Sequence, residues 1–168
     1  MQVRRGGPDS RSPRSIHVGD LLDVPYVAGG LDPATGLDCL GHAIEVHRRL
    51  GKFQPQFAVD RAGAANWLLG PGWASLGCDA ATLRELGDVV VTREPACATG
   101  PRSASGGQGL GVAVLVDAGA PPRLLTSTPA GGARVMTAAA LWRAVGPGGV
   151  EGVYRWRGLG TGTGTTEG

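Results

Sequence analysis

The sequence has little cysteine and few aromatic residues. Its three cysteines, at positions 39, 78 and 97, form no CxxC pair and no Cys/His spacing typical of zinc sites. The odd number and the spacing argue against a disulfide framework and against a bound structural metal. Aromatic residues make up only 5% of the chain, whereas glycine occurs 30 times and proline 12 times. We therefore expect a single domain with long loops and a modest core.

Charge of one sign and long apolar runs are also missing. The net charge is +2 and the arginines are spread along the chain, so no nucleic-acid partner is expected. No apolar run follows the basic N-terminus, which predicts neither a secretory signal nor membrane insertion. Gly29 and Gly30 lack the context of a phosphate-binding loop, and we expect no cofactor.

Polar segments bracket the predicted domain. Residues 1–14 are rich in Gly, Pro, Ser and Arg, and residues 158–168 are rich in Gly and Thr. Such segments bury too little apolar surface to order themselves, so both ends are predicted to be flexible and the domain to span residues 15–157. Residues 93–110 are similarly polar and are predicted to form a long exposed loop. We expect this loop and the C-terminal tail to contact partner subunits.

The segment from Pro25 to Gly41, PYVAGGLDPATGLDCLG, is the most informative part of the chain. Asp38 is a plausible N-cap for a helix over residues 39–50, which Gly51 would end. Cys39 then lies in the first turn, where free backbone N–H groups and the helix dipole stabilise a thiolate. This is the environment of a nucleophilic cysteine.

The second half of the chain predicts an antiparallel sheet. Short apolar runs separated by turn residues follow one another after the amphipathic helix, a pattern typical of an α+β fold. We also expect short helices or turns at residues 16–22, 62–69 and 80–86. The predicted strands are Asp88–Thr92, Gly111–Val116, Arg123–Ser127, Ala133–Thr137 and Val150–Trp156.

The Pro25 to Gly41 segment resembles the nucleophile segment of the NlpC-type cysteine peptidases, especially their phage tail-tip branch. The run Gly87-Asp88-Val89-Val90-Val91 resembles the first strand of that family, and Gly152-Val153-Tyr154-Arg155 resembles its C-terminal close. The likeness spans about residues 16–156. It implies a small papain-like fold, with N-terminal helices packed on an antiparallel sheet.

The catalytic histidines of that family are missing at the aligned positions. Gly111 stands where the resemblance places the histidine base, and Thr126 where it places the polar orienter. A positioned base typically contributes about 10²–10⁴-fold to such a reaction. The three histidines of the chain are weaker substitutes: we interpret His42 as a surface residue or a replacement base, His47 as a core residue and His17 as part of the lead-in.

Three functions remain open on this evidence. The favoured one is a non-catalytic structural component of a phage tail tip or related tail-like particle, such as a gene transfer agent. Its partners would be other tail-tip or baseplate subunits, or peptidoglycan, and it would be made in the bacterial cytoplasm and located in the particle. The alternative is an active cysteine endopeptidase or amidase that cleaves peptidoglycan stems with Cys39. The third is an acyl-handling enzyme of the same broad fold, which needs the same missing base.

Overall fold

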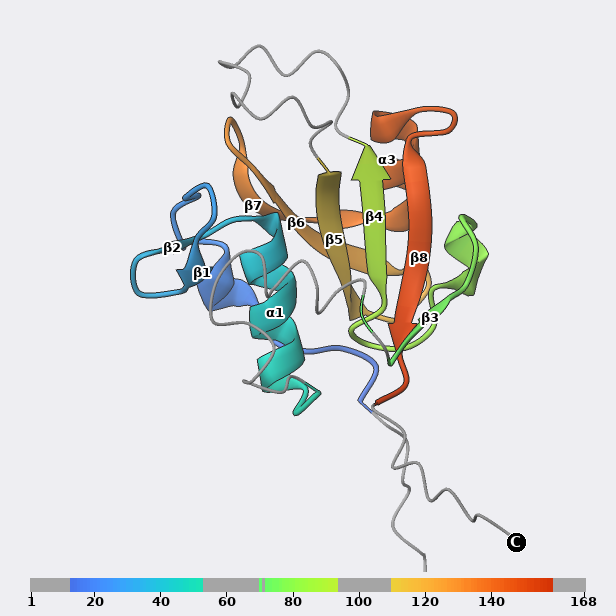
Figure 1. Ribbon diagram of the computed structural model, residues 1–168, viewed down its shortest axis with the longest axis horizontal. Coiled ribbons are helices and arrows are strands. Elements are labelled where there is room, and N and C mark those ends of the chain that lie inside the picture. Colours follow the sequence, from blue (N-terminus) through green and yellow to red (C-terminus); the bar gives the residue numbers. More distant parts are fainter. Residues whose placement is uncertain (1–12, 53–69, 71, 94–109, 159–168) are drawn as a thin grey trace, which may run out of the picture.

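A computed structural model describes residues 13–52, 70, 72–93 and 110–158 (Figure 1). It begins with the 3₁₀ turn η1 (Gly19–Leu21), the small hairpin β1 (Leu31–Asp32) and β2 (Gly36–Leu37), and the helix α1 (Cys39–Arg49). The predicted N-terminal segment, C-terminal tail, 93–110 loop and 62–69 helix lie wholly or almost wholly outside the described residues.

The rest of the described chain forms a six-stranded antiparallel sheet with a second helix. The sheet has the order β3-β8-β4-β5-β6-β7, and each neighbouring pair is antiparallel. The predicted α+β class is therefore confirmed. The elements are β3 (Trp73–Ser75), the 3₁₀ turn η3 (Ala80–Thr82), β4 (Val89–Arg93), β5 (Leu110–Asp117), β6 (Arg123–Thr128), β7 (Gly132–Thr137), α3 (Ala138–Val145) and β8 (Val150–Trp156).

The two faces of the sheet carry separate apolar cores. On one face, Val112, Val114 and Leu125 join the buried residues of α1. On the other, Ala113 and Leu115 join the apolar residues of α3. Successive side chains of a strand point to opposite faces, so each of the strands β4 to β8 contributes to both cores. Helix α1 packs on β5 and β6, and α3 lies behind the sheet beside β7 and η3 (Figure 1).

Local sequence explains where α1 begins and ends. The Asp38 side chain accepts a hydrogen bond from the Gly41 N–H (2.8 Å), which satisfies one free donor of the first turn. At the other end, the N–H groups of Gly51 and Lys52 donate to the carbonyls of Arg48 and His47. Gly51 adopts φ +66°, the left-handed conformation that this type of helix end favours. The helix predicted from the N-cap and Gly51 is thus confirmed to within one residue.

The helix α1 is buried almost all round rather than on one face. Leu40 to Ile44, Val46 and His47 are all buried, and α1 contacts the β1–β2 hairpin and η1 as well as β5 and β6. Among the described residues, no helix is long and apolar enough to span a membrane.

Candidate functional site

Cys39 is the first residue of α1, as predicted, and is partly buried at the edge of the core. The loop before it is held by the Asp38 carboxylate, which is 1% exposed. One carboxylate oxygen accepts from Gly41 N–H, and the other accepts from Gly29 N–H at 3.1 Å. Asp38 therefore caps the helix and ties the glycine-rich loop to it.

Glycines allow the loop and the helix to touch through their backbones. A Cβ added at Gly41 would collide with the Gly30 carbonyl oxygen, and one added at Gly30 would collide with that of Gly36. The Gly30 carbonyl also accepts from Asp38 N–H at 3.1 Å. The glycine pattern that resembles a peptidase loop thus has a packing role: a larger residue at Gly41 would push α1 away from the loop, and one at Gly30 would collide within the loop and hairpin.

His42 lies one turn after Cys39 and is completely buried. Its Nδ1 is 2.8 Å from the Asp38 carbonyl oxygen and 3.2 Å from Ser127 Oγ, and its Nε2 is 3.2 Å from the Leu21 carbonyl oxygen. Because a carbonyl oxygen only accepts, Nδ1 must donate in a hydrogen bond with the Asp38 carbonyl, and Nε2 must donate in one with the Leu21 carbonyl. The interpretation of His42 as a surface residue is wrong: the imidazole connects α1 to η1 and β6.

His47 is a core residue, as predicted. It is fully buried, its Nε2 donates to the Gly87 carbonyl oxygen at 2.7 Å, and its ring lies 5.2 Å from that of Trp73. Burial lowers the pKa of His47 to about 4, because the interior disfavours the charged ring. It follows Cys39 by eight residues, which is roughly 12 Å along the axis at about 1.5 Å per residue.

His17, the remaining histidine, lies in the lead-in near the other end of α1. Its carbonyl oxygen accepts from the Arg49 guanidinium at 3.3 Å, and Arg49 is the last residue of the helix. The same guanidinium forms an ion pair with Asp20, which lowers the pKa of that carboxyl group to about 2. All three histidines are thus on α1 or before it, and none is on a strand of the sheet.

Gly111 and Thr126 belong to the face of the sheet that points away from α1. Thr126 is paired with Ala113, which lies in the core on the α3 side. Gly111 is paired with Thr92, and a Cβ at Gly111 would point to Thr92 Oγ1 at 2.5 Å. The neighbours that face α1 are Val112 and Ser127. A side chain at position 111 or 126 therefore points to the face of the sheet opposite α1.

Ser127 is the polar sheet residue that sequence reasoning missed. It is 5% exposed and places its hydroxyl against the His42 ring. Its direct neighbour Thr126 instead donates to the Val112 carbonyl oxygen at 3.2 Å. The two adjacent hydroxyl residues were a signal that one of them faces α1, but the sequence did not reveal which.

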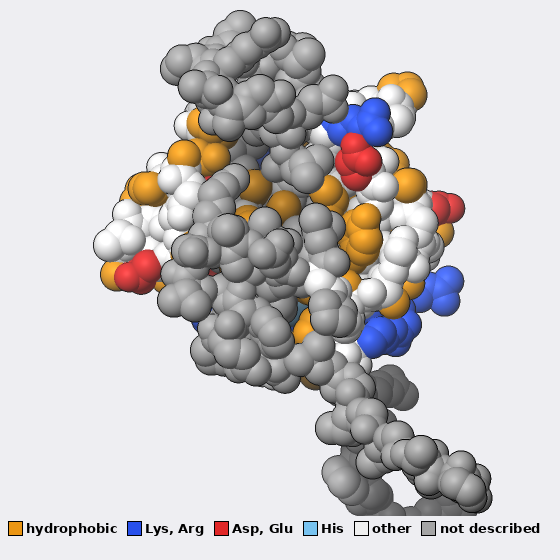
Figure 2. Space-filling view, viewed as in Figure 1, with side chains coloured by type: hydrophobic (Ala, Val, Ile, Leu, Met, Phe, Trp, Pro, Cys, Tyr) orange, Lys and Arg blue, Asp and Glu red, His pale blue; other side chains and the backbone are white. Residues whose placement is uncertain are grey.

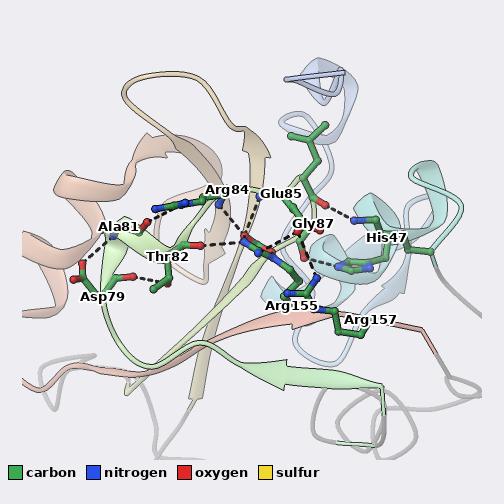
Figure 3. Close-up of polar contacts among 12 residues, drawn as sticks. His47, Asp79, Ala81, Thr82, Arg84, Glu85, Gly87, Arg155 and Arg157 are labelled. Atoms are coloured by element: carbon green, nitrogen blue, oxygen red, sulfur yellow. Dashed lines mark hydrogen bonds and ion pairs between the residues drawn. The ribbon is translucent and has the colours of Figure 1, made fainter. Parts of the chain in front are cut away.

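A second buried polar centre surrounds Asp88, the residue just before β4; Figure 3 shows Arg155, Thr82, Arg84 and Glu85 gathered there. Its carboxylate accepts from Arg155 Nε (2.7 Å) and Nη2 (2.6 Å), and from the N–H groups of Arg84 and Glu85. Arg155 also donates to the Thr82 carbonyl oxygen at 3.0 Å. This ion pair raises the pKa of Arg155. Asp88, from the Gly87-Asp88 pair that resembles the peptidase family, thus fixes the turn before β4 and connects that turn to Arg155 of β8.

Two of the cavities that border the described residues are well defined, and Cys39 lines neither. One, of about 500 Å³, is lined by Cys78, Trp142 and the turn from Gly146 to Gly148. The other, of about 670 Å³, lies at the C-terminal end of α1. Over the ranges that the structure describes, no group of three or more His, Cys, Asp or Glu side chains is arranged to hold a metal ion.

Comparison with known proteins gives no family assignment. No protein-family model matches the chain, and no curated protein matches it.

Proposed function

We propose that this chain is a non-catalytic structural component of a phage tail tip or related tail-like particle. In this proposal it is built on a degenerate, papain-like NlpC-type domain, with Cys39 as the vestigial nucleophile. The α+β architecture, with the cysteine at the start of a helix packed on an antiparallel sheet, is compatible with that fold. Its partners would be other tail-tip or baseplate subunits, or peptidoglycan.

The location of the histidines is the observation that carries this proposal. Peptide cleavage by a cysteine needs a base to activate the thiol and an acid to protonate the leaving amine, two roles that one imidazole usually fills. In this chain no strand carries a histidine, and the helix-facing positions Val112 and Ser127 supply no base of suitable strength. His42 and His47 are buried, and backbone carbonyl oxygens hold their rings.

A peptidoglycan digestion assay distinguishes the proposal from the peptidase alternative. Purified full chain should release no peptide fragments above background from isolated cell walls, and Cys39→Ala should behave identically. Digestion by the wild type that Cys39→Ala abolishes would overturn the proposal. Cys78→Ala is the matched control, because Cys78 is an exposed thiol that lines a cavity to which Cys39 does not contribute.

A particle assay tests the structural role itself. The chain should be found by mass spectrometry in purified tail-like particles at constant stoichiometry with the other tail subunits. Cys39→Ala should enter the particles as well as the wild type does. Absence of the chain from such particles would refute this part of the proposal.

A further inference from the structure

A cleft with an apolar floor and a basic rim opens at the C-terminal end of α1. Its volume is about 670 Å³. The floor is formed by Leu50, Leu86 and Ala118, of which Leu86 is buried in the fold and the other two are partly exposed. The rim includes the cationic side chains Arg14 and Arg84, which are exposed, and Lys52, which is partly buried.

No carboxylate of the described part of the chain neutralises these three cations. The Lys52 ammonium donates to the Leu86 carbonyl oxygen at 2.7 Å, and Arg84 Nε donates to the Ala81 carbonyl oxygen at 3.4 Å. Arg14 lines the cleft, and its backbone carbonyl accepts from Ala118 N–H at 2.7 Å. Each cation therefore keeps its full charge and several unused N–H donors.

Glu85, the acidic residue among those that line the cleft, already forms ion pairs with two arginines of β8 and the segment after it. The Glu85 carboxylate lies 3.1 Å from Arg155 and 3.7 Å from Arg157 (Figure 3). The C-terminal carbonyls of α1 nearest the cleft also have donors, from Gly51 and Lys52 N–H. Among the residues that line the cleft, three cations thus stand against one carboxylate, which is already paired.

From this arrangement we infer that the cleft binds an acidic peptide segment with a bulky apolar anchor, supplied by a partner protein. The anchor would lie on Leu50, Leu86 and Ala118, and its flanking carboxylates would pair with Arg14, Lys52 and Arg84. This inference names a partner chemistry and does not depend on whether Cys39 is catalytic.

The shape favours a peptide over the other polyanions. A nucleic acid is bound along a basic stripe with aromatic stacking platforms, whereas these cations surround one cleft whose floor is aliphatic. An anionic membrane is typically bound by a cluster of roughly 4–8 Lys/Arg or by an amphipathic helix, whereas three cations line this cleft. Figure 2 shows one face of the molecule, on which the basic side chains of the described residues are scattered rather than gathered in one broad patch.

Fluorescence anisotropy with synthetic probes tests the inference on the full chain. The probe is a labelled eight-residue peptide of Asp and Glu with Leu and Phe at its centre. The matched peptides replace Leu and Phe by Ser, or Asp and Glu by Lys. Arg14→Gln and Arg84→Gln are predicted to weaken binding of the acidic probe by roughly 2–5-fold each, and the double variant by roughly tenfold or more. Arg143→Gln is the control, because Arg143 is exposed at the other cavity.

The probes make every result decisive. Tight binding of the Leu/Phe acidic peptide, weaker binding of the Ser version and loss of binding in the double variant support the inference. Equal binding of the two acidic peptides, unchanged binding in the double variant, or no binding at all would overturn it. The inference would also be overturned if the peptide did not bind while the chain sedimented with phosphatidylglycerol vesicles, or bound oligonucleotides, in a way that depends on Arg14 and Arg84.

Discussion

Acid should destabilise this protein through His47. Its pKa in the folded protein is about 4, against 6.5 for an ordinary histidine, because burial beside Gly87 disfavours the charged ring. As the pH falls from 6.5 towards 4, the unfolded chain takes up a proton at this ring while the folded chain does not. The free energy of unfolding therefore falls with the pH in this window, and the contribution of His47 is complete above about pH 6.5.

The size of the effect follows from the two pKa values. A difference of 2.5 units between 6.5 and 4 corresponds to roughly 3 kcal/mol at about 1.4 kcal/mol per unit. Other groups also titrate in this range, so the effect is isolated by comparison with His47→Gln, whose side chain can donate to Gly87 but does not titrate.

Urea unfolding of the wild type and of His47→Gln between pH 4 and pH 7 measures the contribution of His47 to the free energy of unfolding. The advantage of the wild type over His47→Gln should shrink by roughly 3 kcal/mol from pH 7 to pH 4. A difference that stays constant within about 1 kcal/mol over this range would refute the reasoning, because it would mean that the ring titrates alike in both states.

Three further perturbations test other contacts. Arg155→Met should destabilise the fold by roughly 3–5 kcal/mol in thermal or urea unfolding, because it leaves the Asp88 carboxylate buried without its ion pair. A double-mutant cycle with Asp88→Asn should show strong coupling between the two residues. Gly41→Ala should destabilise by roughly 1–3 kcal/mol because its Cβ collides with the Gly30 carbonyl, although Ala favours helices over Gly; a gain in melting temperature would contradict this. Ser127→Ala should lose roughly 0.5–1.5 kcal/mol of the free energy of unfolding through its contact with His42, and an unchanged value would show that the contact is not stabilising.

The main elements could be predicted because each has a local signal. The helix α1 has its N-cap at Asp38 and its ending glycine at position 51, and turn residues separate the apolar runs of β4 to β8. The elements that were missed are short or ambiguous. The strands β1 and β2 have two residues each and β3 has three, too few to show a period, and α3 follows β7 without an intervening turn.

The site could not be predicted because side-chain direction depends on register. In β5 both faces are apolar, so Val112 and Ala113 give no alternation that identifies the face toward α1. A shift of one residue exchanges the two faces of a strand. In the register that the structure shows, Gly111 and Thr126 face away from α1, and Ser127 contacts His42. His42 was misassigned because its ring lies between η1 and β6, in contact with the Leu21 carbonyl and the Ser127 hydroxyl, and is therefore buried.

The segment around Cys39 is explained by packing without reference to the thiol. Asp38 caps the helix and accepts a hydrogen bond from Gly29 N–H. The absence of a side chain at Gly30 and Gly41 allows the loop and helix backbones to touch, and His42 connects the helix to its neighbours. Each of these residues makes a contact that the fold needs whether or not the chain is an enzyme. A motif that resembles a nucleophile segment is therefore weak evidence for catalysis here. If so, Cys39→Ser should leave the melting temperature within a few degrees of the wild type, whereas Asp38→Ala should destabilise by roughly 1–2 kcal/mol. Equal losses from both variants would show that the thiol itself contributes to the stability of this segment.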